Sequence, residues 1–164
     1  MPSDAVLYQA AALCLTYPDE EFRARLPLLR EAAPQLREFT DHAAVTPARV
    51  LAAHYTRVFG LKHRHSLYLS WWHDGESGPR GMSPAGLREL YRAHGLEFAG
   101  EELPDFLPAV LEFAARTGEV GLLTEYRDGL DRLRARLTAV GTPYACVLTA
   151  VCAALPAARP GVRP

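Results

Sequence analysis

Three of the six histidines fall between positions 63 and 73, and no other residues of this 164-residue chain suggest chemistry so directly. His63 and His65 form a His-x-His pair of the kind that metal sites use, and His73 follows them. A closed zinc site needs four ligands, however, and no cysteine or carboxylate follows at a second helical spacing such as i, i+4. A metal-binding protein or enzyme that uses these histidines is therefore the alternative hypothesis, and exposed or hydrogen-bonded histidines are favoured.

Serine-based catalysis has less support. The sequence contains no G-x-S-x-G elbow, no P-loop and no G-x-G-x-x-G motif. Ser66, Ser70 and Ser77 also lack the strand-to-helix context that a nucleophile elbow needs. We therefore predict no catalytic residues, no bound metal and no cofactor, so that the protein is not an enzyme.

Both tryptophans lie in the same stretch, Tyr55 to Met82, which mixes aromatic with basic residues and ends in a Gly-rich loop. Buried His, Arg and Trp nitrogens each require a hydrogen-bond partner, so such a mixture is unusual for a core helix. Adjacent residues on a helix point about 100° apart. We therefore expect Trp71 and Trp72 to have different surroundings, with one of them lining a groove or an edge.

Asp105 precedes an apolar helical pattern and is predicted to cap it, which would put Pro108 at the third helical position, where its missing N–H costs nothing. A capping carboxylate with a free lone pair can also receive an arginine or a peptide N–H, so a ligand-facing role stays open beside the cap. Glu112 lies two turns further on, on roughly the same face, and is either solvated, paired or part of the same site.

The elements that must position these residues are predicted to be helices, because apolar residues recur at three- and four-residue steps along most of the chain. Leu67, Leu69 and Trp71 alternate with their neighbours as a strand would. A single strand without a partner would leave its backbone donors unpaired, so we predict a short helix or turn there. The predicted helices start near Ser3 or Asp4, Asp19, Pro34, Thr46, Ser83, Asp105 and Thr142, and one long amphipathic helix covers residues 123–140. Thr46 and Gly60 are predicted to cap the two ends of the fourth helix.

These patterns indicate an all-α fold, a single-domain bundle of about eight helices over residues 1–155 followed by a disordered tail at residues 156–164. Eighteen basic against 19 acidic residues leave a net charge of -1, which gives no reason to expect a nucleic acid partner. No run of about 18 apolar residues is present, so we expect no membrane insertion. The N-terminus lacks the features of a secretory signal, and Cys14, Cys146 and Cys152 are predicted to be buried thiols, both of which favour a cytoplasmic protein.

Several motifs occur together in one order and spacing. They are Tyr55-x-x-x-Phe59, Leu67-Tyr68-Leu69-Ser70, His73-x-Gly75-Glu76-Ser77, Arg80-Gly81, and Glu102-Leu103-Pro104-Asp105-Phe106-Leu107-Pro108-x-x-Leu111-Glu112-Phe113. Together they resemble the nitrate reductase assembly chaperones, the NarJ type within the wider TorD/DmsD group of redox-enzyme maturation proteins. One departure is the segment Ser77-Gly78-Pro79-Arg80, because members usually carry a more basic loop there.

The resemblance implies a TorD/NarJ-like fold and a cytoplasmic chaperone that binds the N-terminal tail of the apo catalytic (alpha) subunit of a respiratory nitrate reductase. Such a chaperone assists molybdenum cofactor insertion before membrane attachment, and molybdenum cofactor delivery proteins are a second implied partner. Helical bundles bind amphipathic peptides in apolar grooves with a few polar anchors. Carried onto this sequence, the groove comprises Tyr55, Phe59, Leu67, Tyr68, Trp71 and Leu107, the polar anchors are His73, Asp105 and Glu112, and the rim carries Glu76 and Arg80. A dimeric scaffold that uses exposed tryptophans is a third hypothesis.

Overall fold

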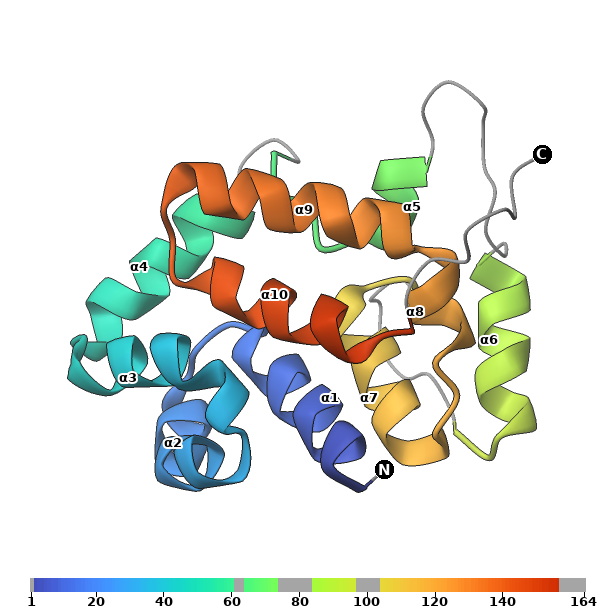
Figure 1. The fold of residues 1–164 in the computed structure, drawn as a ribbon, viewed down its shortest axis with the longest axis horizontal. Helices are drawn as coiled ribbons and strands as arrows, with labels where there is room; N and C mark the ends of the chain where they lie inside the picture. Colours follow the sequence, from blue (N-terminus) through green and yellow to red (C-terminus); the bar gives the residue numbers. More distant parts are fainter. Residues whose placement is uncertain (1, 61–63, 74–83, 97–103, 157–164) are drawn as a thin grey trace.

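The computed structural model of the chain describes residues 2–60, 64–73, 84–96 and 104–156 (Figure 1). These residues form ten α-helices and one 3-10 turn. They are α1 (Pro2–Cys14), α2 (Glu20–Ala32), the 3-10 turn η1 (Pro34–Leu36), α3 (Arg37–Val45), α4 (Ala48–Phe59), α5 (Leu69–His73), α6 (Pro84–Ala93), α7 (Leu107–Thr117), α8 (Gly121–Glu125), α9 (Arg127–Val140) and α10 (Tyr144–Ala154). The all-α prediction is confirmed. The predicted tail, apart from Pro156, lies outside the described residues.

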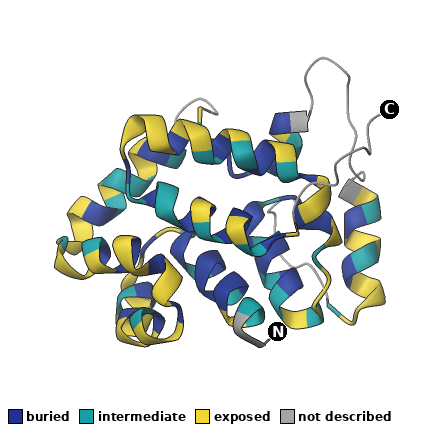
Figure 2. Ribbon diagram, in the orientation of Figure 1, coloured by how far each residue is buried: buried dark blue, intermediate teal, exposed yellow. Residues whose placement is uncertain are grey.

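Helix α1 is the centre of the fold. It packs against α7 on one side and α10 on another, while α2 meets it at one end (Figure 1). Its alanines Ala10, Ala11 and Ala12 are buried together with Leu7 and Cys14, and Figure 2 shows most of the helix as buried. A helix of that composition belongs in the interior of a domain. Small side chains also let the neighbouring helices approach it closely.

A second layer covers this centre. Helix α9 runs alongside α10, and the short α5 packs on α9 (Figure 1). Helices α2 and α3 pack together, with the two exposed side chains of Arg30 and Asp41 paired at 2.7 Å. An ion pair in contact with solvent contributes little, about 0–1 kcal/mol. The buried face of α2, formed by Phe22, Leu26 and Leu29, therefore holds it in place.

Several predicted helix termini are confirmed. Asp19 is the N-cap of α2, since its Oδ1 accepts the backbone N–H of Phe22 at 2.9 Å. Pro84 is the first residue of α6, and Gly95 follows that helix with φ +77°. A positive φ is strained for residues with a Cβ, which explains glycine at this position.

Of the two predicted caps of α4, Thr46 is wrong, whereas Gly60 is the C-cap as predicted but does not adopt the predicted left-handed conformation. The Thr46 hydroxyl donates to the carbonyl of His42 at 2.5 Å, so it belongs to the end of α3, and Pro47 precedes α4 without a capping side chain. Gly60 ends α4 with φ -95°, in the right-handed region. The helix thus ends without a left-handed residue.

The long helix predicted over residues 123–140 is two helices. The chain breaks between α8 and α9 at Tyr126, whose φ of -94° and ψ of +19° are not helical. Its side chain is almost completely buried, while its backbone N–H still reaches the carbonyl of Leu122 at 3.1 Å. Because the apolar periodicity continues through the break, periodicity could not show it.

The segment that was predicted to lack a strand partner has one. Tyr68 and Phe106 form an isolated antiparallel bridge. The N–H of Leu69 donates to the carbonyl of Asp105 at 3.1 Å, and the N–H of Leu107 donates to that of Leu67 at 2.8 Å. Residues 67–68 are therefore extended, contrary to the prediction, and the predicted short helix follows them as α5. A partner only a few residues long leaves no alternating pattern in the sequence.

The three cysteines are free thiols. Cys14 and Cys152 are buried as predicted, and Cys146 is half-buried. Burial, with the nearby charge of Asp131, raises the pKa of Cys152 to about 11. Within the described ranges, none of the helices combines the length and apolar character needed to cross a membrane.

Candidate peptide-binding site

A pocket of about 340 Å³ lies where the last turns of α4 face the bridge pair. Two walls meet there, one from the helix and one from the extended segment before α5, and the segment before α7 contributes one ring. The lining residues are Tyr55, Thr56, Phe59, Gly60, Ser66, Leu67, Tyr68 and Phe106.

The wall on α4 is aromatic. Tyr55 and Phe59 are one helical turn apart, so they project from the same face, and their ring centroids are 5.0 Å apart. The Tyr55 hydroxyl donates to the carbonyl of Leu15 at 2.9 Å, which ties this wall to the end of the central helix. Tyr144 of α10 lies behind it, with its ring edge-on to Tyr55 at 5.9 Å and to Phe59 at 4.9 Å. Tyr144 thus packs on one side of these two rings, and the pocket lies on their other side.

The opposite wall combines two segments that are far apart in the sequence. The rings of Tyr68 and Phe106 lie 5.0 Å apart, directly on the backbone bridge. Ser66 accepts the N–H of Tyr68 on its Oγ at 3.1 Å, and its carbonyl accepts the indole N–H of Trp72 at 3.0 Å. Local turns and one tryptophan thus fix a wall that is not part of any helix.

Four of the six residues predicted to form the groove, Tyr55, Phe59, Leu67 and Tyr68, line this pocket. Leu107 is fully buried behind it, and Trp71 is 47% exposed and outside the lining. Trp72 is only 6% exposed, so the prediction that the two tryptophans differ is confirmed.

The predicted polar anchors are not gathered in the pocket. Asp105 is 4% exposed, and its Oδ2 accepts the N–H of Ser70 at 2.9 Å. It therefore caps the first turn of α5, and the prediction that it caps the helix after it is wrong: Phe106 precedes α7 without a capping side chain. Pro108 accordingly stands at the second helical position instead of the third. Glu112 lies further along α7 and pairs with Arg116 at 3.0 Å.

Three further predicted residues cannot be placed, since Glu76, Arg80 and the side chain of His73 lie outside the described residues, as does His63. His65 forms a hydrogen bond between Nδ1 and the carbonyl of Val58 at 2.9 Å. Among the residues that the structure describes, no group of three or more His, Cys, Asp or Glu side chains is arranged to hold a metal ion.

Two aromatic residues at this site were missed as site residues. Phe106 belongs to the Pro-Asp motif, in which the charged Asp105 is the more conspicuous residue. Tyr17 packs edge-on against Tyr55 at 5.9 Å and is largely exposed, so it extends the aromatic surface beyond the pocket. Its position after α1 gave no sign of this, because the residues that follow α1 come close to α4 only in the folded chain.

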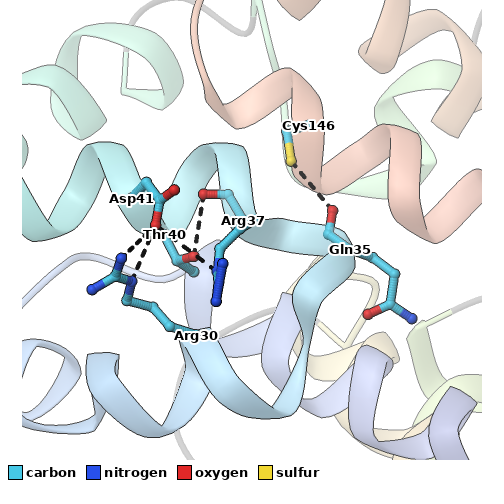
Figure 3. A network of polar contacts seen from close by, with 6 residues as sticks. All are labelled: Arg30, Gln35, Arg37, Thr40, Asp41 and Cys146. Atoms are coloured by element: carbon cyan, nitrogen blue, oxygen red, sulfur yellow. Dashed lines mark hydrogen bonds and ion pairs between the residues drawn. The ribbon is translucent and has the colours of Figure 1, made fainter.

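A larger hollow of about 670 Å³ lies on another side of the molecule, along α10. Its lining among the described residues has no aromatic ring; it combines alanine and threonine side chains with the charged side chains of Asp4, Arg37 and Glu38. Figure 3 shows the adjoining contacts, where the Cys146 thiol donates to the carbonyl of Gln35 at 3.6 Å. The aromatic pocket is the better candidate for peptide recognition, because aromatic rings offer large apolar contact area at well-defined positions.

The fold of the chain is that of a redox-enzyme maturation protein. A crystal structure described as that of a redox enzyme maturation protein from Archaeoglobus fulgidus is similar, with a TM-score of 0.70 and 25% identity, over 93% of this chain and 92% of that one. Residues 21–150 match the nitrate reductase delta subunit family, and the chain belongs to this family.

Several of its relatives are named as chaperones. A nitrate reductase molybdenum cofactor assembly chaperone, NarJ, of Bacillus subtilis is 32% identical over 92% of this chain and 88% of that protein. NarJ of Escherichia coli K12 is 39% identical over 62% of this chain and 48% of its own length. The nitrate reductase-like protein NarX of Mycobacterium tuberculosis is 35% identical over 90% of this chain, which corresponds to only 24% of NarX. The predictions of a chaperone and of a protein that is not an enzyme are confirmed by this membership.

Proposed function

We propose that this protein is a cytoplasmic chaperone that binds the N-terminal tail of the apo catalytic (alpha) subunit of a respiratory nitrate reductase. It assists the insertion of the molybdenum cofactor into that subunit and its assembly before attachment to the membrane. The names of the relatives support the client, and the pocket between α4 and the bridge pair is the single observation that supports peptide binding.

The dimensions and chemistry of the pocket suit a short amphipathic peptide. Its volume of about 340 Å³ falls within the roughly 300–1,000 Å³ range of pockets that take small ligands. Four rings, those of Tyr55, Phe59, Tyr68 and Phe106, offer apolar faces. A helical peptide would insert apolar side chains spaced three or four residues apart and leave its polar face outside.

The polar residues of the predicted site are proposed to contact the peptide outside the pocket or to hold the pocket in shape. Glu112 is exposed enough to exchange Arg116 for a basic residue of the peptide. Asp105 does not line the pocket, but its hydrogen bond to Ser70 joins α5 to the segment that carries Phe106. His73, Glu76 and Arg80 stay in the proposal as contacts with the polar face of the peptide.

Calorimetric titration with the N-terminal peptide of the alpha subunit from the same organism tests the proposal. We expect Tyr68→Ala and Phe59→Ala to bind at least about tenfold more weakly, which corresponds to about 1.4 kcal/mol. Leu28→Ala is the matched control, because this apolar side chain is 66% exposed on α2 and outside the pocket. An absence of binding heat and of NMR shifts at Tyr68 with the wild-type protein would refute peptide binding.

The client itself is identified in cells. Capture of the tagged protein from nitrate-respiring cells should retain the alpha subunit of the reductase, and molybdenum cofactor delivery proteins if they join the complex. Deletion of the N-terminal tail of the alpha subunit should abolish that capture. Retention of the tail-less subunit at the wild-type level would place recognition elsewhere.

A further inference from the structure

The pocket wall formed by Ser66, Leu67 and Tyr68 connects α4 to α5 and is not itself helical. A connecting segment of this kind holds its shape only if other parts of the protein fix it. Helix α9 contacts a residue on either side of this segment, Arg64 before it and Trp72 after it, although no residue of α9 lines the pocket.

One of these contacts is the packing of Gly129 against Trp72. A Cβ at position 129 would lie 2.8 Å from the Cβ of Trp72 and 3.3 Å from its Cγ. Contacts below about 3 Å between carbon atoms are repulsive, since the optimum is near 3.5–4.0 Å. Gly129 is thus the residue that lets α5 approach α9 closely enough to bury Trp72.

Two arginines on the same face of α9 complete the contact. Arg132 donates from Nη1 to the carbonyl of Trp72 at 3.3 Å, and Arg136 donates from Nη1 to the carbonyl of Arg64 at 3.2 Å. The Cζ of Arg136 also lies 5.1 Å from the centroid of the Trp72 ring, within the range of a cation–π interaction. Positions 129, 132 and 136 are three and four residues apart, so they form one stripe along the helix.

Two hydrogen bonds connect Trp72 to the residues that line the pocket. Its indole N–H donates to the carbonyl of Ser66 at 3.0 Å, and Ser66 in turn accepts the N–H of Tyr68. A continuous chain of contacts therefore runs from α9 through Trp72 to two residues that line the pocket.

We infer that the stripe of Gly129, Arg132 and Arg136 on α9 consists of positioning residues that set the peptide affinity of the pocket by fixing the wall at Ser66–Tyr68. The inference rests on the proposed function, because it assumes that the pocket binds the peptide. It adds a specific role for a helix that does not touch the pocket.

Gly129→Ala tests the inference, with Gly121→Ala as the matched control. A Cβ at Gly121, the first residue of α8, meets nothing within 4 Å. Two measurements are made on each variant below its unfolding temperature: peptide affinity by calorimetry, and amide hydrogen exchange of Leu69, whose N–H bonds to Asp105, without peptide. We expect Gly129→Ala to bind about tenfold more weakly and to exchange the Leu69 amide about tenfold faster, and Gly121→Ala to match the wild type.

Arg136→Ala and Arg136→Lys provide the second test, because this side chain is exposed and its loss leaves the core intact. We expect Arg136→Ala to weaken binding severalfold, and Arg136→Lys to restore part of the loss because it keeps a cation near Trp72. A merely structural role would lower the unfolding temperature without changing the affinity of the folded protein.

The outcomes separate the two proposals. If the wild-type protein binds no peptide, the proposed function fails, and the Leu69 exchange alone decides whether α9 positions the wall. If the wild type binds and Gly129→Ala has unchanged affinity, the inference is overturned, whatever the exchange rate. Unchanged exchange in both Gly129→Ala and Arg136→Ala overturns it as well.

Discussion

The Asp105 carboxylate accepts the backbone N–H of Ser70 at 2.9 Å, so a residue placed just before α7 caps the first turn of α5. The backbone of Asp105 also accepts the N–H of Leu69, which places both contacts beside the bridge of Tyr68 and Phe106. One buried residue thus joins the two segments that form a wall of the pocket.

Replacement of Asp105 by alanine should therefore cost more than an ordinary cap. An exposed cap is worth about 1 kcal/mol, whereas a buried donor left without its acceptor costs about 1–3 kcal/mol. We expect Asp105→Ala to lower the free energy of unfolding by about 2–3 kcal/mol in urea denaturation, and Asp105→Asn, which keeps an acceptor oxygen, to lower it less. Asp19→Ala, at the exposed cap of α2, is the control.

Peptide affinity measured on the same variants separates the roles of Asp105. If the charge contacts the peptide, Asp105→Asn should weaken binding even though it folds well. Equal affinity of Asp105→Asn and the wild type would leave only the structural role.

Two substitutions of Tyr55 should differ in their effect on peptide affinity. Tyr55→Phe removes the hydrogen bond to the Leu15 carbonyl but keeps the ring in the pocket. We expect it to lose about 0.5–1.5 kcal/mol of stability with peptide affinity unchanged. Tyr55→Ala should also weaken binding at least about tenfold. A loss of affinity in Tyr55→Phe would show that the hydroxyl, and not the ring, is recognised.

The two tryptophans should be distinguishable by fluorescence. Trp72→Phe leaves Trp71, which is 47% exposed, and Trp71→Phe leaves Trp72, which is 6% exposed. Acrylamide should quench the first variant strongly and the second weakly, and only the first should have the red-shifted emission of a hydrated indole. Similar quenching in the two folded variants would contradict the structure. Circular dichroism serves as the control for folding.

Stability should fall on acidification because of His54. Burial lowers the pKa of this side chain, and the positive charges of Arg57 and His42 lower it further. Its Nε2 lies 2.7 Å from the Thr142 hydroxyl, and its ring stacks on Tyr144 at 5.7 Å. The unfolded chain binds a proton at about pH 6.5 and the folded protein only at lower pH. The stabilisation is therefore complete above that pH and is lost as the pH falls through the lowered folded pKa.

His54→Gln is the variant that tests this effect, because glutamine can still bond Thr142 but does not titrate. Urea denaturation at about pH 7.5 and about pH 5.5 should show a smaller loss of stability in the variant than in the wild type. Equal losses would assign the pH dependence to other groups.

Much of the fold could be predicted from the sequence because its helices carry local signals. The Asp19 cap, the buried face of α2 and the glycine after α6 each depend on neighbours within one or two turns. The break at Tyr126 could not be predicted, since tyrosine is not a helix-breaking residue and the apolar periodicity continues through this position. The cap at Thr46 failed because a hydroxyl between two helices can serve either one, and only packing decides which.

The candidate site, too, could be predicted only in part from the sequence. The sequence by itself determined an all-helical chain with an aromatic stretch at Tyr55–Tyr68 and a Pro-Asp motif near Asp105, because periodicity and residue type are local properties. Only the tertiary structure decided that these segments share one pocket, that Asp105 caps a helix 35 residues away in sequence, and that Gly129 lets Trp72 pack beneath the wall. Each of these depends on the close approach of segments distant in the chain, and such approaches are set by core packing and leave no mark on local sequence.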